Sequence, residues 1–121
     1  MSVEATIDQY CEAWSHPDPA RRKALLDKVW ADGATHTDPT VHLAGATALL
    51  DHVAIVQAKR PGGRVARVGD VDFHHDVARF YWRAALPDGT VVREGLDLAI
   101  FGETGRLSRI IGFFMPLPAQ M

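Results

Sequence analysis

Hydrophobic residues in the first half of the chain recur at every third or fourth position, which is the spacing of amphipathic helices. The first such segment follows Ser2, a residue type that caps helix N-termini, and its apolar positions are Val3, Ile7, Tyr10, Cys11 and Trp14. Another segment follows Gly45 and stops at residues 60–63, a run that contains one proline and two glycines. Both segments are predicted to be helices.

A further helix is predicted between these two. Asp18-Pro19 marks its start, because aspartate caps helices and proline is favoured in the first turn. We expect it to end at Ala31-Asp32-Gly33. Its predicted apolar face consists of Leu25, Leu26, Val29 and Trp30, and its predicted solvent-facing side of Arg21, Arg22 and Lys23.

The second half of the chain alternates between apolar and polar residues, as strands do. Strands are predicted over residues 64–73, 77–86, 90–101 and 107–115, with a short β-prone piece at 35–37. Asp88-Gly89 is a strong signal for a hairpin turn. Helices followed by antiparallel strands predict an α+β fold.

Composition limits the classes of function. The 121 residues fit one domain, 1–121, and hydrophobic residues make up 47% of them, which excludes a disordered chain. Thirteen basic residues stand against 15 acidic ones, so no nucleic-acid or anionic-membrane partner is expected. No stretch approaches the roughly 20 apolar residues of a membrane span. Cys11 has no second cysteine to pair with, and a reducing cytoplasm is the expected location.

The strand at 90–101 carries the first candidate for chemistry. Arg93, Asp97 and Phe101 share one of its faces, and both faces are mostly apolar, so we expect both to be covered. An aspartate on a covered face is costly unless it is paired or neutral. Asp97 therefore either pairs with Arg93 or a backbone donor, or is a pocket carboxyl with a shifted pKa.

Asp38 and the histidines raise similar alternatives. Asp38 before Pro39 is either a turn former or a functional carboxylate, with His36 on the same side of the strand. His52 is either a histidine at the edge of the core or a group that reaches a cavity. His74 and His75 are adjacent, so in a strand they point to opposite faces and cannot share an ion. We expect no metal, and without a glycine-rich phosphate loop no cofactor.

Several segments together resemble the nuclear transport factor 2-like superfamily and, within it, the SnoaL-like group. The resemblance covers nearly the whole chain. The segments are Tyr10…Trp14, Leu25-Leu26…Trp30-Ala31-Asp32-Gly33-Ala34-Thr35-His36-Thr37-Asp38-Pro39, Gly45…Leu49…His52, Asp72-Phe73-His74-His75-Asp76, Gly95-Leu96-Asp97 and Gly105-Arg106-Leu107…Ile110. The resemblance implies a cystatin-like cone: three N-terminal helices on a strongly curved, mainly antiparallel sheet, a pocket between them, and homodimers through the outer face of the sheet.

Three short motifs are similar to those of ketosteroid isomerases. The likeness implies that Asp38 shuttles a proton, while Tyr10 and Asp97 hydrogen-bond the oxygen of the dienolate. Ketosteroid isomerase is a known case of a catalytic carboxyl that must stay protonated. Arg93 within reach would instead hold Asp97 in its charged form. In the SnoaL-like polyketide cyclases the matching aspartate, here Asp97, is the acid and base of an aldol closure. The related epoxide hydrolases have an Asp-Arg-Asp cluster, but the spacing of its arginine and aspartate differs from that of Arg93 and Asp97 here.

The resulting hypothesis is a cofactor-independent isomerase, lyase or cyclase that acts on a small hydrophobic carbonyl compound. Asp38, Asp97 and Tyr10 are the predicted catalytic residues. The predicted substrate-binding residues are Trp14, His36, His52, Val56, Arg93 and Phe101. The alternative is a non-catalytic pocket protein, since Arg93 suits a carboxylate ligand.

Overall fold

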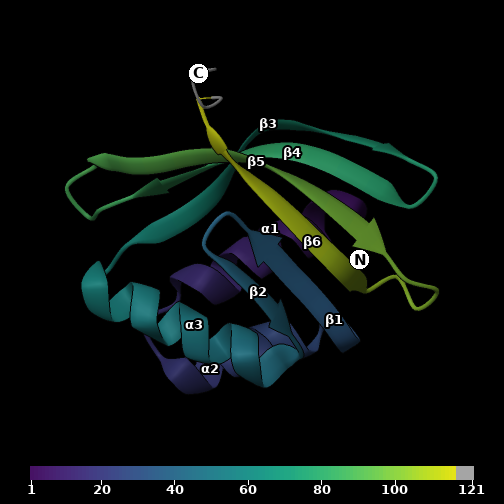
Figure 1. Cartoon of the computed structure of the whole chain (residues 1–121), viewed down its shortest axis with the longest axis horizontal. Coiled ribbons are helices and arrows are strands. Elements are labelled where there is room, and N and C mark those ends of the chain that lie inside the picture. Colours follow the sequence, from purple (N-terminus) through teal and green to yellow (C-terminus); the bar gives the residue numbers. More distant parts are fainter. Residues whose placement is uncertain (117–121) are drawn as a thin grey trace.

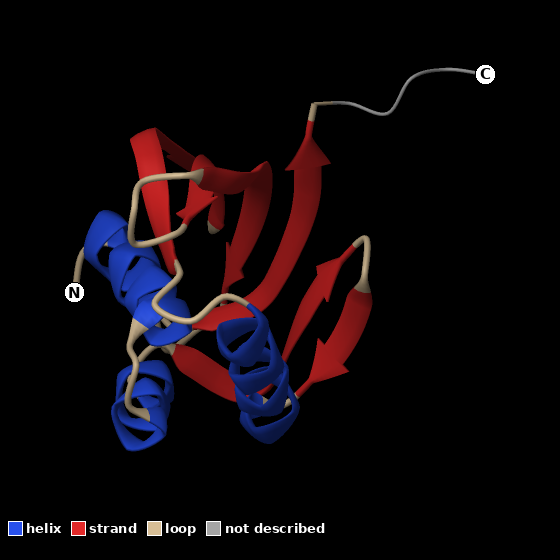
Figure 2. Cartoon of the chain, turned by 90° about the vertical axis from the view of Figure 1, so that its left-hand side faces the viewer, coloured by secondary structure: helices blue, strands red, loops and turns tan. Residues whose placement is uncertain are grey.

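Three helices lie together on the concave side of a curved sheet in the computed structural model, which describes residues 1–116 (Figures 1 and 2). The helices are α1 (Val3–Ser15), α2 (Pro19–Asp27) and α3 (Ala46–Lys59). The strands are β1 (Trp30–Asp38), β2 (Val41–Ala44), β3 (Arg64–His74), β4 (Val77–Ala85), β5 (Val91–Phe101) and β6 (Leu107–Met115). The α+β cone predicted from the sequence is confirmed.

The sheet has the order β2-β1-β6-β5-β4-β3 and does not close on itself. All neighbouring strands are antiparallel except β1 and β6, which run parallel. The hydrophobic core lies between the helices and the concave face, with Ile7, Leu26, Leu49, Phe80 and Ile110 almost fully buried. This core fixes the two walls between which a cavity opens.

The local signals for the first two helices are confirmed. The Ser2 hydroxyl accepts a hydrogen bond from the Ala5 amide, and the Asp18 carboxylate accepts one from the Ala20 amide. The second helix is shorter than predicted, however. It ends at Asp27, because Val29 accepts a backbone hydrogen bond from Leu107 and Trp30 pairs with that residue as the first position of β1.

One expectation about the surface is wrong, and another is not met within a single chain. Arg22 is buried rather than facing water, because its guanidinium donates to the backbone carbonyls of His16 and Pro17 between α1 and α2. The outer face of β5 is not covered within residues 1–116: Leu96, Leu98 and Ile100 are half-buried there, and Phe113 beside them on β6 is exposed. The helices cover the concave face (Figure 2).

His74 and His75 do not point to opposite faces. His75 lies in the turn after β3 with φ of 47°, and its Nδ1 is 3.2 Å from that of His74. Within residues 1–116, no group of three or more His, Cys, Asp and Glu side chains gathers closely enough to hold a metal ion. None of the described helices is long and apolar enough to cross a membrane.

Candidate functional site

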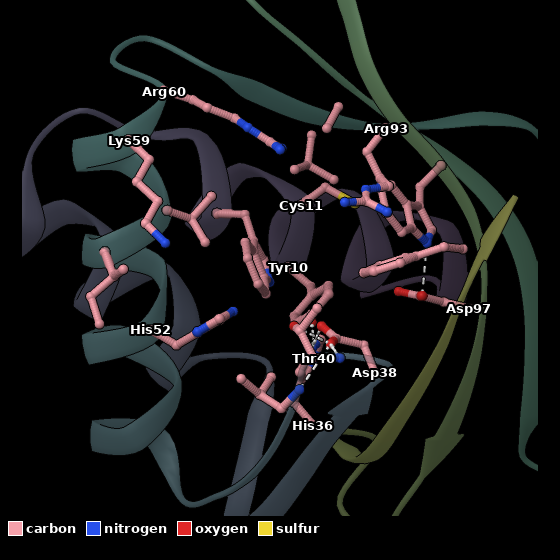
Figure 3. Close-up of a pocket in the computed structure, with 18 residues that line it drawn as sticks. Tyr10, Cys11, His36, Asp38, Thr40, His52, Lys59, Arg60, Arg93 and Asp97 are labelled. Carbon is pink, nitrogen blue, oxygen red and sulfur yellow. Dashed lines mark hydrogen bonds and ion pairs between the residues drawn. The ribbon is translucent and has the colours of Figure 1, made fainter.

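A cavity of about 450 Å³ opens between α1, α3 and the concave face of the sheet (Figure 3). Eight of the nine predicted site residues line it: Tyr10, Trp14, His36, Asp38, His52, Val56, Arg93 and Asp97. Phe101 is the exception. It lies at the far end of β5, and its ring packs edge-on against Phe73 with 5.8 Å between centroids, outside the cavity lining.

Three of the lining residues form a hydrogen-bonded row. The Tyr10 hydroxyl is 3.0 Å from His36 Nδ1, and His36 Nε2 is 2.9 Å from Asp38 Oδ2. The row joins α1 to the end of β1, where alternate residues His36 and Asp38 face the same side. His36 is only 4% exposed, so each of its nitrogens depends on these partners.

Asp38 is held as a carboxylate. Its Oδ1 accepts hydrogen bonds from the backbone amides of Thr40 and Val41 and from the Thr40 hydroxyl. Burial alone would raise the pKa of Asp38, but the hydrogen bonds from His36 and Thr40 outweigh it and hold the pKa well below its usual range. Asp38 is therefore both the turn former and the cavity carboxylate that the sequence offered as alternatives.

Asp97 lies in a different environment on the neighbouring wall. It is 7% exposed, and its Oδ1 accepts a hydrogen bond of 2.8 Å from Trp82 Nε1. Its Oδ2 receives no hydrogen bond from any residue in 1–116. Burial raises the pKa of Asp97 to about 7, and the charge on Asp38 adds to this effect, against the opposing influences of His36 and Trp82.

Arg93 does not pair with Asp97, although the two residues share a face of β5. Its guanidinium instead stacks over the ring of Phe114, 4.0 Å from the ring centroid. The expectation that Arg93 would hold Asp97 in its charged form is therefore wrong. An aromatic face competes with the carboxylate for the planar guanidinium.

Two glycines make room for Asp97 and its partner. A Cβ at Gly95 would collide with the indole of Trp82, which packs across that position of β5. A Cβ at Gly112 on β6 would lie 2.8 Å from Asp97 Oδ1. Glycine within a strand often marks such a close approach, so Gly95 and Gly112 were signals in the sequence that large side chains pack across these positions.

Sequence reasoning did not single out Thr40 as a partner of Asp38, Trp82 as the partner of Asp97, or two cationic residues at the rim of the cavity. Thr40, two residues after Asp38 and directly after Pro39, was recognisable as an Asx-turn partner. Trp82 gave no such signal, because its contact with Asp97 depends on strand register. Lys59 and Arg60 also line the cavity from the end of α3.

Aromatic rings form the rest of the wall near the row. The Trp14 ring centroid is 5.4 Å from that of His36 and 5.8 Å from that of His52. Its buried indole Nε1 has no hydrogen-bond partner within residues 1–116. Burial lowers the pKa of His52 and raises that of the Cys11 thiol, so both groups favour their neutral forms.

Comparison with known proteins identifies the fold family. No protein-family model matches the chain, and no curated protein matches it in sequence. A solved structure does: a proposed isomerase of the SnoaL-like family from Agrobacterium tumefaciens, 29% identical, with a TM-score of 0.86 over 93% of this chain and 96% of that chain. The chain shares the fold of the SnoaL-like and nuclear transport factor 2-like proteins.

Two other solved structures share the fold at lower identity. A proposed polyketide cyclase from Sinorhizobium meliloti is 16% identical, with a TM-score of 0.70 over 89% of this chain and 93% of that chain. A proposed ketosteroid isomerase from Kribbella flavida is 13% identical, with a TM-score of 0.67 over 98% of this chain and 81% of that chain. The fold of this chain is thus shared with proteins that are named as isomerases and as a cyclase.

Proposed function

We propose that this nuclear transport factor 2-like protein is a cofactor-independent acid–base catalyst for a small hydrophobic carbonyl compound, acting as an isomerase, lyase or cyclase. The observation that carries the proposal is the Asp97 carboxyl. It is buried in the cavity wall with one oxygen fixed by Trp82 and the other without a protein donor. The names of the related structures, an isomerase and a cyclase among them, agree with this class of reaction.

Asp97 is the group suited to transfer the proton. A general base works best when its pKa lies near the working pH, and burial raises the pKa of Asp97 to about 7. We assign to it the removal of a proton from the carbon next to the carbonyl group and the return of that proton elsewhere on the substrate. Asp38 is a weaker base, because both of its oxygens already accept hydrogen bonds.

Tyr10, His36 and Asp38 would then form the side of the cavity that binds the carbonyl oxygen. The Asp38 carboxylate fixes a proton on His36 Nε2. In the neutral ring Nδ1 then accepts from the Tyr10 hydroxyl, and this hydroxyl can exchange that bond for one to the substrate oxygen when a carbonyl compound binds. A donor placed in this way stabilises the negative charge that develops on an enolate oxygen.

Proton exchange tests this function without knowledge of the final product. A panel of small aryl ketones and 1,3-diketones is incubated in D2O, and the loss of the proton signal next to the carbonyl is followed by NMR. The wild-type protein should accelerate exchange for at least one compound. Asp97→Asn should abolish that acceleration, and Asp38→Asn should reduce it by about 10–1000-fold through the loss of Tyr10 positioning.

The Thr90→Ser variant, altered at the end of the hairpin loop away from the cavity, is the matched control and should exchange like the wild type. Wild-type exchange no faster than in buffer would contradict the proposal and leave the non-catalytic binding alternative. Undiminished exchange in Asp97→Asn would remove Asp97 from its role.

A further inference from the structure

Three cationic side chains line the same cavity. Lys59 and Arg60 come from the C-terminal end of α3, and Arg93 comes from β5 on the opposite wall. Figure 3 shows the Lys59 amine and the Arg60 guanidinium directed from α3 toward the interior of the cavity, with Arg93 on the far side. Asp38 and Asp97 are the only carboxyl groups in the lining.

These three cations have no carboxylate partner within 4.0 Å among residues 1–116. Other basic side chains on the surface do have one, namely Lys23, Arg64, Arg67, Arg79 and Arg83. Arg93 stacks on Phe114 and makes no ion pair within residues 1–116, which leaves its N–H donors available. Arg21, Lys28, Arg106 and Arg109 also lack such a partner but are exposed outside the lining, whereas Lys59, Arg60 and Arg93 meet around one cavity.

The charge of the cavity is opposite to that of the whole chain, whose formal net charge is −2. Asp38 is already engaged by His36 and Thr40, so it does not neutralise the cations at the rim. Asp97 accepts from Trp82 and makes no ion pair with Arg93. Like charges that converge on one space repel one another, and an anion that enters the cavity offsets this repulsion.

We infer that the ligand is an organic oxyanion, an apolar carbonyl compound whose carboxylate or phosphate group is bound by Lys59, Arg60 and Arg93. This inference rests on the proposed function for the carbonyl end of the molecule, which lies against Tyr10 and Asp97. The anionic group then fixes which carbon of the substrate faces Asp97. Neutral carbonyl compounds of the same size bind more weakly and in more than one orientation.

Matched probes test the charge preference without turnover. Naphthalene-1-acetate, its neutral isostere naphthalene-1-acetamide and 1-naphthyl phosphate are titrated into the protein and followed by calorimetry. We expect one of the two anions to bind at least about tenfold more tightly than the amide, which corresponds to several weak, partly solvated ion pairs. The anion that binds more tightly identifies the group as carboxylate or phosphate.

The triple variant K59Q/R60Q/R93Q should bind the anions no more than about twofold more tightly than the amide. The variant R21Q/K28Q/R106Q, which loses the same charge at exposed positions outside the cavity, should keep the wild-type preference. K59Q alone, at an exposed helix end, gives a partial loss if the triple variant does not fold.

Equal affinity for the amide and both anions, or no binding of any probe, would overturn the inference. Loss of the preference in the control variant would overturn it as well, because it would assign the effect to overall charge. These outcomes are independent of proton exchange by Asp97. A failed charge preference with intact exchange therefore leaves the proposed function standing.

Discussion

A carboxyl group with a raised pKa makes the stability of a protein fall as the pH rises. Between about pH 4, where an unfolded aspartate ionises, and pH 7, where native Asp97 does, the native state binds more protons than the unfolded state. The contribution that protonated Asp97 makes to the free energy of unfolding is thus fully present below pH 4 and is lost as the pH rises through 7. Ionised Asp97 therefore destabilises the folded state at neutral and alkaline pH.

Asp97→Asn should remove this destabilisation. The amide oxygen keeps the hydrogen bond from Trp82, and the group carries no charge to bury. At pH 8 we expect the variant to be more stable than the wild type by on the order of 2–4 kcal/mol, and at pH 4 to be nearly equal to it. Urea unfolding at both pH values measures the difference. A difference that does not change with pH would mean that Asp97 titrates normally.

At this scale the sequence predicted the side chains of the site but not their pairing. The pattern placed Tyr10, His36 and Asp38 correctly, because two of them alternate along one strand and the third lies on the apolar face of a helix. It offered Arg93 or a backbone donor as the partner of Asp97, whereas the partner is Trp82. That choice depends on Phe114, which meets Arg93 only after β5 and β6 have paired.

Pairing of β4 with β5 sets the environment of Asp97. Trp82 lies opposite Gly95 in this register, and its indole crosses the space that a side chain at position 95 would fill. Gly95→Ala should force the indole away from Asp97 Oδ1, which removes a donor that lowers the pKa of this carboxyl. We expect the Asp97 pKa to rise above its wild-type value and the fold to lose about 1–3 kcal/mol.

Carbon-13 NMR of the Asp97 carboxyl, assigned with Asp97→Asn, measures the first effect, and thermal unfolding measures the second. Gly102→Ala is the control, since a Cβ at Gly102 would make only ordinary van der Waals contacts and this residue lies outside the cavity lining. An unchanged Asp97 titration in Gly95→Ala would show that Trp82 does not influence it.

Element boundaries could be predicted where the pattern was long and not where strand pairing decided them. The limits of α3 and β6 agree with the prediction, since each has a full periodic pattern and a glycine or proline near its ends. The four residues of β2 are too few to show alternation, and pairing with β1 makes them a strand. Val29 and Trp30 fit a helical pattern equally well, but hydrogen bonding and pairing with Leu107 of β6 leave Val29 in a turn and make Trp30 the first residue of β1.

The convex side of the sheet bears a row of apolar side chains across four strands. Val68 pairs with Tyr81, Tyr81 with Leu96, and Leu96 with Phe113. Tyr81 is 53% and Phe113 49% exposed, which is much for such large side chains. Because a continuous apolar surface of this kind is typical of an interface, we expect a homodimer with the two rows face to face.

Tyr81→Glu combined with Phe113→Glu should convert the dimer to a monomer, since each charge would lie in an apolar, two-fold symmetric contact. Sedimentation equilibrium gives the mass in solution. Ile55→Glu, which changes an equally exposed residue on the helical side of the molecule, should leave the dimer intact. A wild-type protein that sediments as a monomer at micromolar concentration would contradict the prediction.

The contact between Trp82 and Asp97 also has a spectroscopic consequence. The fluorescence emission of an indole depends on the charge close to its N–H. The Asp97 carboxyl, which accepts a hydrogen bond from Trp82 Nε1, changes its charge near pH 7. Two of the three tryptophans, Trp14 and Trp82, line the cavity, and Trp82 alone touches this carboxyl. The protein thus carries its own fluorescent indicator of the proton on Asp97, readable in unlabelled material while a compound enters the cavity.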